Sequence, residues 1–322
     1  MIALIKSFKP VLFIMRITII GFGNQAKAWA SNLQDSNIKV RVALRPDSHS
    51  IALAVKAGFE VVSTLDPSFY QEDAYALLTP DQGHHEFLQV HGYKFRADTL
   101  ILYAHGYSLT KHHLEKTYPQ LQHLLFAPKA IGSELRNQFV IKGKLGAVYS
   151  LEHVRNKSVV KDWLLTLAQG LGINLGPYET SFERETQADL FSEQGLLCSV
   201  IPYTAVEMFN QLTETGVEPE LAYFECWHEL KLIINAMVDK GPQGFFDLIS
   251  PNALVGSEKG YQKLMTPEFK HNLGSLLKDI RSGEFDEDLD AADVAALRQT
   301  IRKRFAGSLV MTTFDKINRE SK

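Results

Sequence analysis

The first half of the chain alternates short, uninterrupted apolar runs with segments of helical periodicity. Such runs between helices are typical of the strands of a parallel sheet that helices cover on both faces. We therefore predict an α/β domain that begins near Arg16 and extends beyond Tyr149. The predicted strands are ITIIGF, VRVALR, AYALLT, TLILYAHG, HLLFAP and LGAVYS, and an amphipathic helix over 156–170 leads into a last strand, INLGPYET.

The pattern becomes purely helical at Thr180. Thr180-Ser181-Phe182-Glu183 has the form of a capping box, in which a hydroxyl and a later glutamate satisfy the first amides of a helix. Beyond it the sequence predicts helices only, one of which Pro219 would open and Gly241 would close. We therefore predict a Rossmann-like parallel-sheet domain over 1–179 and an all-α domain over 180–322.

Length, composition and charge narrow the class of protein. A chain of 322 residues is long enough for two cores, and 45% hydrophobic with 22% charged residues is ordinary for a globular protein. A net charge of −3 gives no basis for binding nucleic acid, and no later stretch is apolar enough to span a membrane. Cys198 and Cys226 lie in apolar helical stretches, so we predict buried, reduced thiols in a cytoplasmic protein.

The N-terminal residues 1–14 are apolar and include two lysines, as a short secretion signal would. They lack a small-residue cleavage site, however, and lead directly towards the first predicted strand. We therefore expect a loosely structured extension, or a chain that in fact begins at Met15.

Two pairs of acidic residues interrupt the apolar faces of predicted helices. Asp189 and Glu193 are four residues apart, and Glu225 and Glu229 repeat this spacing. Residues i and i+4 share one face of a helix, so each pair places two carboxylates side by side. The ordinary interpretation is a solvated face or a ladder of ion pairs. Against it, no Lys or Arg follows the first three acids by three or four residues.

The apolar residues around both pairs predict that these acids face the core. Four anions buried without compensation would cost many kcal/mol, so a cation should lie among them. A site of carboxylate oxygens suits Mg²⁺ or Mn²⁺ and suits neither zinc nor copper. We therefore predict a divalent metal site made by Asp189, Glu193, Glu225 and Glu229.

A nucleotide-binding turn follows the first predicted strand. Gly21-Phe22-Gly23-Asn24-Gln25-Ala26 is a G-x-G-x-x-A motif between the strand ITII and a predicted helix. The first glycine permits the tight turn, the second lets a pyrophosphate approach the backbone, and the helix N-terminus faces the phosphates. This motif in this context indicates a dinucleotide site of the Rossmann type.

The end of the second predicted strand indicates which dinucleotide is bound. NAD-binding proteins commonly place an acid there for the ribose hydroxyls. This chain has Arg45, followed by Ser48 and Ser50, and a guanidinium with two hydroxyls suits a 2′-phosphate. We therefore predict NADPH. Asp47 is the counter-argument, although a turn after Pro46 explains it as well.

These stretches resemble one enzyme family, the ketol-acid reductoisomerases (acetohydroxy acid isomeroreductases), in particular its short-chain class. The similarity extends from about Arg16 to Phe285 and is carried by GFGNQAKAWASNL, ALRPDSHS, ALLTPDQ, YAHG, APK, ETQADLFSEQGLLC and AYFECWHELKLI. The last two stretches contain the four acids. The resemblance implies a Rossmann-type domain followed by a helical domain through which two chains intertwine, with the active site between subunits.

The resemblance also implies roles for individual residues. Asp189 would bridge two Mg²⁺ ions and Glu193 would ligate one of them. Glu225 and Glu229 of the partner chain would complete the surroundings of the second ion and hold the substrate. Ser250 would contact the substrate, although by itself it is as simply a turn hydroxyl before a proline.

His105 and Lys129 match the family's polar residues near the metals and the nicotinamide. Each follows a predicted strand, so both should emerge at the edge of the sheet where ligands bind. A lone His or Lys after a strand is more often an ordinary loop residue. Thr79-Pro80-Asp81 is likewise a turn, with a cofactor contact only by the resemblance.

The family's chemistry needs these parts. 2-Acetolactate or 2-aceto-2-hydroxybutyrate undergoes a Mg²⁺-dependent alkyl migration, and NADPH reduces the resulting 2-keto acid to a 2,3-dihydroxy acid in branched-chain amino acid biosynthesis. The two ions act as Lewis acids on neighbouring oxygens. Glu229 or a metal-bound water would carry the proton, and Lys129 would help to position the ligands.

Two loops differ from the family's usual sequences. Lys129 is followed by Ala-Ile-Gly-Ser in place of Gly-Pro-Gly-His, and Ser250 by Pro-Asn-Ala-Leu in place of Asn-Thr-Ala-Glu. These differences leave open a paralogue that reduces another 2-keto acid, such as ketopantoate. A non-catalytic NADPH-binding dimer and a plain nicotinamide dehydrogenase are further alternatives, but neither needs paired acids.

Overall fold

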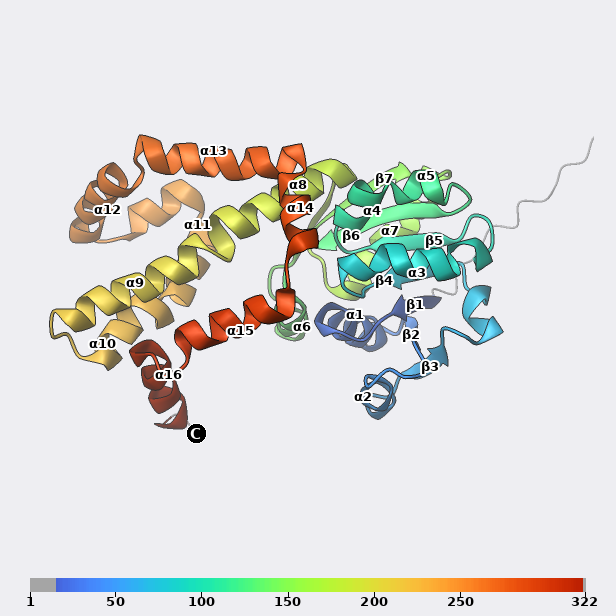
Figure 1. The fold of residues 1–322 in the computed structure, drawn as a ribbon, viewed down its shortest axis with the longest axis horizontal. Helices are drawn as coiled ribbons and strands as arrows, with labels where there is room; N and C mark the ends of the chain where they lie inside the picture. The colour runs from blue at the N-terminus through green and yellow to red at the C-terminus, as the bar shows by residue number, and fades with distance from the viewer. Residues whose placement is uncertain (1–15, 321–322) are drawn as a thin grey trace, which may run out of the picture. The chain divides into compact units, whose positions relative to one another are not determined.

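The computed structural model describes residues 16–320, and the chain divides into two compact units between Thr186 and Gln187 (Figure 1). The first unit is an α/β domain and the second is helical, which confirms the predicted fold class. The expectation for residues 1–14 lies outside the described residues. Among residues 16–320, no helix is long and apolar enough to cross a membrane.

The first unit is built on an eight-stranded sheet in the order β3-β2-β1-β4-β5-β6-β7-β8. The order reverses between β1 and β4, and this is the point of a parallel sheet where ligands bind beyond the carboxyl ends of the strands. The strands are β1 (Arg16–Ile20), β2 (Lys39–Leu44), β3 (Glu60–Ser63), β4 (Ala74–Leu77), β5 (Leu100–Tyr103), β6 (Gln122–Pro128), β7 (Gly146–His153) and β8 (Leu175–Glu179).

Two features of the sheet depart from the predicted arrangement. β6 and β7 pair antiparallel, while the other neighbours pair parallel. An apolar run does not reveal the direction of its strand, because alternate side chains face the two layers in either orientation. β3 was not predicted, since EVVS is a short strand at the sheet's edge and buries only Val62.

Alternate strand residues enter two hydrophobic layers, one on each face of the sheet. Ile19 belongs to the layer that contains Trp29 and Leu167, and Ile20 to the layer that contains Leu88 and Tyr118. The first layer is closed by α1 (Asn24–Asp35), α2 (Ile51–Lys56), α6 (Gly132–Val140) and α7 (Lys157–Leu171), and the second by α3 (His84–His91), α4 (Tyr107–His112) and α5 (Leu114–Thr117).

The predicted long helix after Thr180 is α8 (Phe182–Ser192), but its cap differs in detail. Ser181 Oγ accepts a hydrogen bond from the Arg184 amide at 3.1 Å, so Ser181, one residue after the predicted Thr180, is the capping side chain. Glu152 accepts a second bond, from the amide of Phe182 at 3.0 Å. The start of α8 is therefore tied to β7 of the first unit.

The second unit contains helices only, within the described residues. They are α9 (Val200–Glu214), α10 (Pro219–Tyr223), α11 (Leu230–Leu248), α12 (Pro251–Leu264), α13 (Pro267–Ser282), α14 (Glu284–Ala291), α15 (Val294–Phe305) and α16 (Leu309–Glu320). Pro219 opens α10 as predicted, and Gly241, at φ 70°, breaks the helical conformation inside α11. A small core around Phe209 and Tyr223 joins α9, α10 and α16.

Two π-helical turns lie beside the acid pairs, at Glu193–Leu197 and Phe224–His228. A π turn adds one residue, which rotates the rest of the helix by about 100° around its axis. The apolar helix faces that were predicted to point into the core are therefore not buried by the single chain after these turns. Leu197 is 54% exposed and Cys198 is exposed, so the prediction of two buried thiols is wrong for Cys198 and correct for Cys226.

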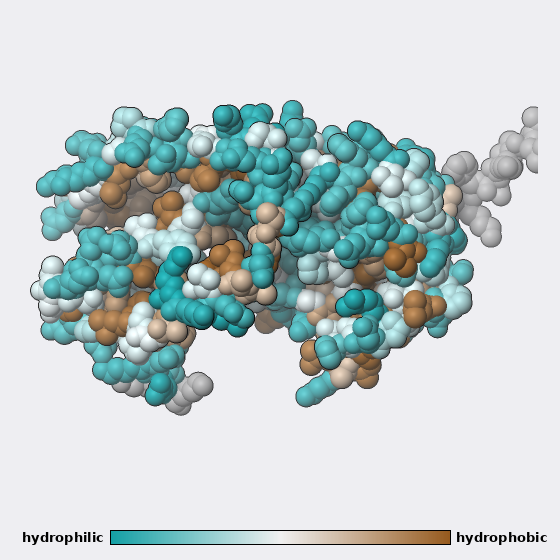
Figure 2. All heavy atoms as spheres, viewed as in Figure 1, coloured by the Kyte–Doolittle hydropathy of each residue, from teal (hydrophilic) through white to brown (hydrophobic). Residues whose placement is uncertain are grey.

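The helical unit leaves much apolar surface uncovered (Figure 2). α11 has no buried residue along its whole length, although Leu232, Met237, Val238 and Phe246 are all apolar. Large contiguous apolar surfaces on a folded chain are typical of protein interfaces. Covering these helices requires a surface that the chain's own described residues do not provide.

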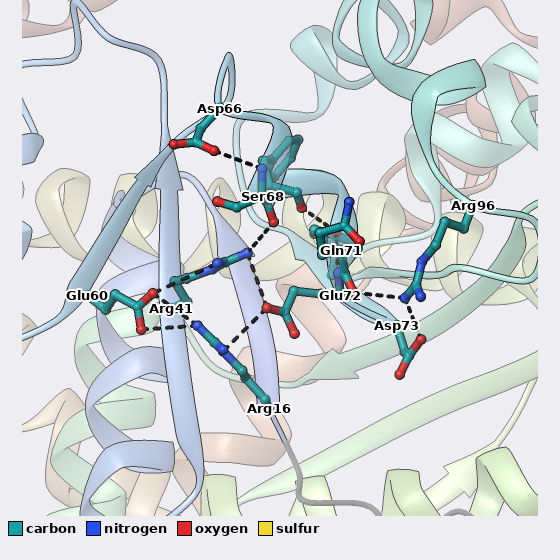
Figure 3. A network of polar contacts seen from close by, with 11 residues as sticks. Arg16, Arg41, Glu60, Asp66, Ser68, Gln71, Glu72, Asp73 and Arg96 are labelled. Carbon is teal, nitrogen blue, oxygen red and sulfur yellow. Dashed lines mark hydrogen bonds and ion pairs between the residues drawn. The ribbon is translucent and has the colours of Figure 1, made fainter.

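A network of ion pairs joins residues of β1 and β2 on the side of the sheet where these strands begin (Figure 3). Arg41 Nη2 lies 3.2 Å from Glu72 Oε1; the Arg41 side chain is buried, at 6% exposed, and that of Glu72 is 14% exposed. Arg16 adds contacts to Glu72 at 3.4 Å and to Glu60 at 3.0 Å. The two arginines thus share two carboxylates.

We expect Arg41→Met to lower the free energy of unfolding by about 2 kcal/mol, because it leaves Glu72 buried with Arg16 as its remaining partner. Arg96→Met is the matched control: its ion pair with Asp73 is exposed and should contribute less than about 1 kcal/mol. Urea unfolding of the variants measures both. Equal losses of unfolding free energy in the two variants would show that the burial of the Arg41–Glu72 pair does not increase its contribution to stability.

A second prediction concerns pH. Burial lowers the pKa of His123 from 6.5 to about 4 in the folded protein, where it lies between Tyr103 and the carbonyl of Tyr118. Between these values the unfolded chain binds a proton that the folded chain does not, so stability falls as pH falls from about 6.5 to about 4. His123 by itself should contribute about 2 kcal/mol to the loss between pH 7.5 and pH 5.

Unfolding measured at both pH values tests this, with His123→Asn beside the wild type. The variant should lose less stability on acidification, because the buried imidazole is gone. His271→Gln, an exposed histidine on α13, should keep the wild-type dependence. A His123→Asn variant with an unchanged pH dependence would contradict the assignment.

Candidate active site

Five predicted loops meet at one edge of the sheet. The registers place Ile20 of β1 beside Leu77 of β4, Leu77 beside Tyr103 of β5, and Tyr103 beside Leu125 of β6. The segments that follow these strands therefore emerge at the same carboxyl edge, together with the one after β2. They carry the glycine motif, Arg45, Thr79-Pro80-Asp81, His105 and Lys129.

The glycine motif has the conformation that a dinucleotide turn needs. Gly21 has φ 100°, and a Cβ there would lie 3.0 Å from Thr79 Cγ2 and 3.1 Å from the carbonyl oxygen of Leu78. Gly23 precedes α1, and a Cβ at this position would meet nothing within 4 Å. The surface above the helix N-terminus is thus open to a pyrophosphate.

Two side chains of the motif are directed into the protein. Phe22 is buried and packs edge-on against Phe59, and the Gln25 amide donates to the carbonyl of Ala130 at 2.9 Å. Any contact of Phe22 or Gln25 with a cofactor would therefore come mainly from the backbone. Asn24, by contrast, is exposed.

The loop after β2 is exposed, as a 2′-phosphate site must be. The Arg45 side chain is 80% exposed, and its Nε lies 3.9 Å from Asp47 Oδ1. Ser48 Oγ accepts a hydrogen bond from the Ser50 amide at 3.3 Å, which orders the turn. A phosphate bound here would compete with Asp47 for Arg45 and gain a charge-assisted bond.

Glu185 is the centre of the polar groups at this edge. Its side chain is 1% exposed, Oε1 lies 2.6 Å from Lys129 Nζ, and Oε2 accepts from the Gly106 amide at 2.7 Å. His105 Nε2 lies 3.8 Å from the same Oε2. A buried carboxylate is stable only with such partners.

Gly106 allows this close approach. A Cβ at Gly106 would lie 2.5 Å from the carbonyl oxygen of Phe182 and 2.6 Å from Thr186 Oγ1, so any other residue would push α8 away from β5. The sequence predicted His105 and Lys129 but missed Glu185. The signal was present, since Glu185 precedes Asp189 by the same four residues that separate Asp189 from Glu193.

α8 is one uninterrupted helix that passes through the boundary of the units, so Asp189 is placed one turn beyond Glu185. Asp189 is half-buried. Ligand atoms of His105, Glu185 and Asp189 lie within 4.8 Å of one another, close enough for one metal ion. Carboxylate oxygens with one imidazole suit a hard divalent cation.

The other predicted metal ligands and the predicted substrate contact lie in the helical unit. Glu193 begins the first π-helical turn, and Glu225 and Glu229 lie within and just after the second; all three are exposed in the single chain. Ser250 caps α12, where its Oγ accepts from the Ala253 amide at 3.2 Å. π turns are frequent at functional sites.

Two family models match the chain. Residues 11–176 match "Acetohydroxy acid isomeroreductase, NADPH-binding domain", and residues 182–313 match "Ketol-acid reductoisomerase, C-terminal domain". A ketol-acid reductoisomerase (NADP(+)) of Helicobacter pylori is 34% identical over 277 residues, 85% of this chain and 83% of its own. One of Corynebacterium diphtheriae is 33% identical over 293 residues, 89% and 85% of the two chains.

Solved structures give the same relationship. The chain is similar to an NADH-preferring ketol-acid reductoisomerase from an uncultured archean, with a TM-score of 0.83, 26% identity and 96% of both chains covered. A pyrroline-5-carboxylate reductase from Coxiella burnetii has a TM-score of 0.61 at 15% identity, covering 83% of this chain and 97% of its own. The second likeness concerns the fold alone.

The Lys129–Glu185 pair yields a prediction about stability. Lys129→Met should lower the free energy of unfolding by about 2 kcal/mol, because Glu185 is almost fully buried and is left with the Gly106 amide and with His105, 3.8 Å away. The Lys129 side chain is 38% exposed, which makes the loss smaller than for a fully buried pair. Adding Glu185→Gln should recover at least half of it.

A double-mutant cycle in urea measures this coupling. The Lys316→Met variant serves as the control, because Lys316 and its partner Glu220 are both exposed, and it should change stability little. If the double variant is less stable than Lys129→Met alone, charge burial is not the source of the loss.

Proposed function

The chain belongs to the family of ketol-acid reductoisomerases and is an NADP-dependent oxidoreductase of branched-chain amino acid biosynthesis, and from this premise we propose how its residues divide the reaction. The substrate is 2-acetolactate or 2-aceto-2-hydroxybutyrate, and the product is the 2,3-dihydroxy acid. The observation that carries the proposal is the cluster of Lys129, Glu185 and His105 beside Asp189 at the edge of a dinucleotide-binding sheet.

NADPH is held at the turn after β1. The open approach to Gly23 and the N-terminus of α1 receive the pyrophosphate, through backbone N–H groups. Arg45, Ser48 and Ser50 receive the 2′-phosphate, which explains an arginine at the end of β2 in place of an acid. Thr79-Pro80-Asp81, at the end of β4, borders the same crevice.

Asp189 and Glu193, with Glu225 and Glu229 of a second copy of the chain, would hold two Mg²⁺ ions. This donor set fits a hard divalent cation, since all four groups are carboxylates, and an Asp189 oxygen also lies within 4.8 Å of ligand atoms of His105 and Glu185. When bound, the ions supply Lewis-acid polarisation of the substrate oxygens and NADPH supplies the hydride. Ser250, at the N-terminus of α12, meets the substrate carboxylate.

The chain's own residues then orient the substrate and move the proton. Lys129 carries a positive charge that Glu185 holds in place, so its Nζ can stabilise oxygens on which negative charge develops. His105 Nε2 lies 3.8 Å from Glu185 Oε2, at the edge of the sheet where the nicotinamide would bind. Glu229 accepts the proton of the migrating system's hydroxyl.

A second copy of the chain is required in this proposal. The exposed apolar side chains of α11 support this requirement, because Leu232, Met237 and Val238 are not covered within one chain. A homodimer through the helical units would bury them and bring the partner's Glu225 and Glu229 to Asp189. An active monomer in size-exclusion chromatography would contradict the shared site.

NADPH oxidation tests the proposal, with 2-acetolactate and with the pre-isomerised 3-hydroxy-3-methyl-2-ketobutyrate, each with and without Mg²⁺. The wild-type protein should turn over both and need Mg²⁺ for both. Asp189→Asn should lower the rate by at least about 100-fold with either substrate, since it removes the bridging carboxylate.

Glu183→Gln is the matched control, because it removes an exposed acid from the same helix. It should leave both rates unchanged. Normal isomerisation by Asp189→Asn would contradict the proposed bridging role of Asp189. Turnover of only the pre-isomerised compound by the wild-type protein would mean that it is a reductase without the alkyl migration.

A further inference from the structure

A buried histidine outside the predicted site lies directly behind His105. His84 is 2% exposed and begins α3, and both of its ring nitrogens are engaged. Nε2 lies 2.9 Å from the carbonyl oxygen of Thr79, and Nδ1 lies 2.8 Å from Ser108 Oγ. The imidazole thus joins the turn after β4 to α4, which follows His105.

The tautomer of His84 is determined by these partners. A carbonyl oxygen can only accept, so His84 Nε2 carries a proton and donates it to Thr79. Burial lowers the pKa of His84, which keeps the ring neutral and leaves Nδ1 to accept from the Ser108 hydroxyl. A neutral, fully bonded ring of this kind is a rigid cross-link between two loops.

Asp81 stands between this cross-link and His105. Its Oδ1 lies 3.5 Å from His84 Nδ1, and its Oδ2 lies 3.5 Å from His105 Nδ1. The opposite nitrogen of His105 faces Glu185 Oε2 at 3.8 Å, and the ring is stacked on that of buried Tyr107 at 6.1 Å and 10°. Tyr107 therefore packs against the face of the His105 ring, and the carboxylates of Asp81 and Glu185 lie at the two nitrogens on its edge.

We propose that Asp81 and His84 are positioning residues for the proposed reaction: Asp81 holds the proton of His105 on Nδ1, and His84 holds the turn that carries Asp81. The protonation of one imidazole nitrogen is set by the bond that the other one makes. Nε2 of His105 then presents a lone pair to the site beside Glu185 and Asp189. This gives the Asp81 carboxylate a role other than the predicted cofactor contact, and it rests on the proposed function.

Steady-state kinetics with NADPH and 2-acetolactate test the two residues. Asp81→Asn and His84→Phe should each lower kcat by about 10- to 100-fold, since a small misplacement of a catalytic group has effects of this size. KM for NADPH should stay within about two-fold, because the proposal assigns the Asp81 carboxylate to His105 in place of the cofactor contact that the resemblance implied. His84→Gln, which can donate to Thr79 and accept from Ser108, should retain most of the rate.

Two controls separate positioning from general damage. His85→Phe alters the neighbouring histidine, which bonds Gln89 and stacks on His112 outside this network, and should keep the wild-type kcat. In a His105→Asn background, Asp81→Asn should have little further effect, because its target is gone. Additive losses in that double variant would overturn the proposal.

A readout that needs no substrate distinguishes this proposal from the proposed function. In ¹⁵N spectra of histidine-labelled protein, His105 Nδ1 should carry a proton in the wild type and carry it less in Asp81→Asn. A proton on Nε2 with a bare Nδ1 in the wild type would refute the role of Asp81. Absence of acetolactate turnover in the wild type would count against the function alone.

Discussion

The burial of one carboxylate, Glu185, determines how this active site is assembled. A nearly inaccessible anion is tolerated only where hydrogen bonds and an opposite charge surround it. Lys129 from the end of β6 and the Gly106 amide from the end of β5 provide these partners. Glu185 itself comes from the start of α8, so satisfying it brings three segments, distant in sequence, to one edge of the sheet.

This arrangement also explains the placement of the metal residues. α8 is anchored at its beginning by Ser181, Glu152 and the Glu185 contacts. Asp189 is carried one turn further on the same face. The contacts that fix the first turn of α8 therefore also place Asp189, which lies on the next turn of the same helix.

The general fold, and the meeting of the glycine motif, His105 and Lys129 at one edge of the sheet, could be predicted because they depend on local patterns. Apolar runs identified the strands, the glycine motif identified the first turn, and His105 and Lys129 follow strands whose ends align. What failed depended on features that spacing does not encode. Ser181 caps α8 instead of Thr180 because the chain enters the helix one residue later, and Cys198 is exposed because a π turn rotates the face after Glu193.

Glu185 was missed for a different reason. An acid next to Thr186 on an apolar face looks like part of a helix surface until its cationic partner, more than fifty residues earlier, is brought to it by the sheet. Periodicity identifies the face on which a residue lies, but the partner across that face is a property of the tertiary fold. The same limit applies to His84, whose two hydrogen bonds require the turn after β4 and the start of α4 both to lie beside the start of α3. Residues that position others are therefore the ones that a sequence shows least, because their partners are distant in the chain and meet them only in the folded protein.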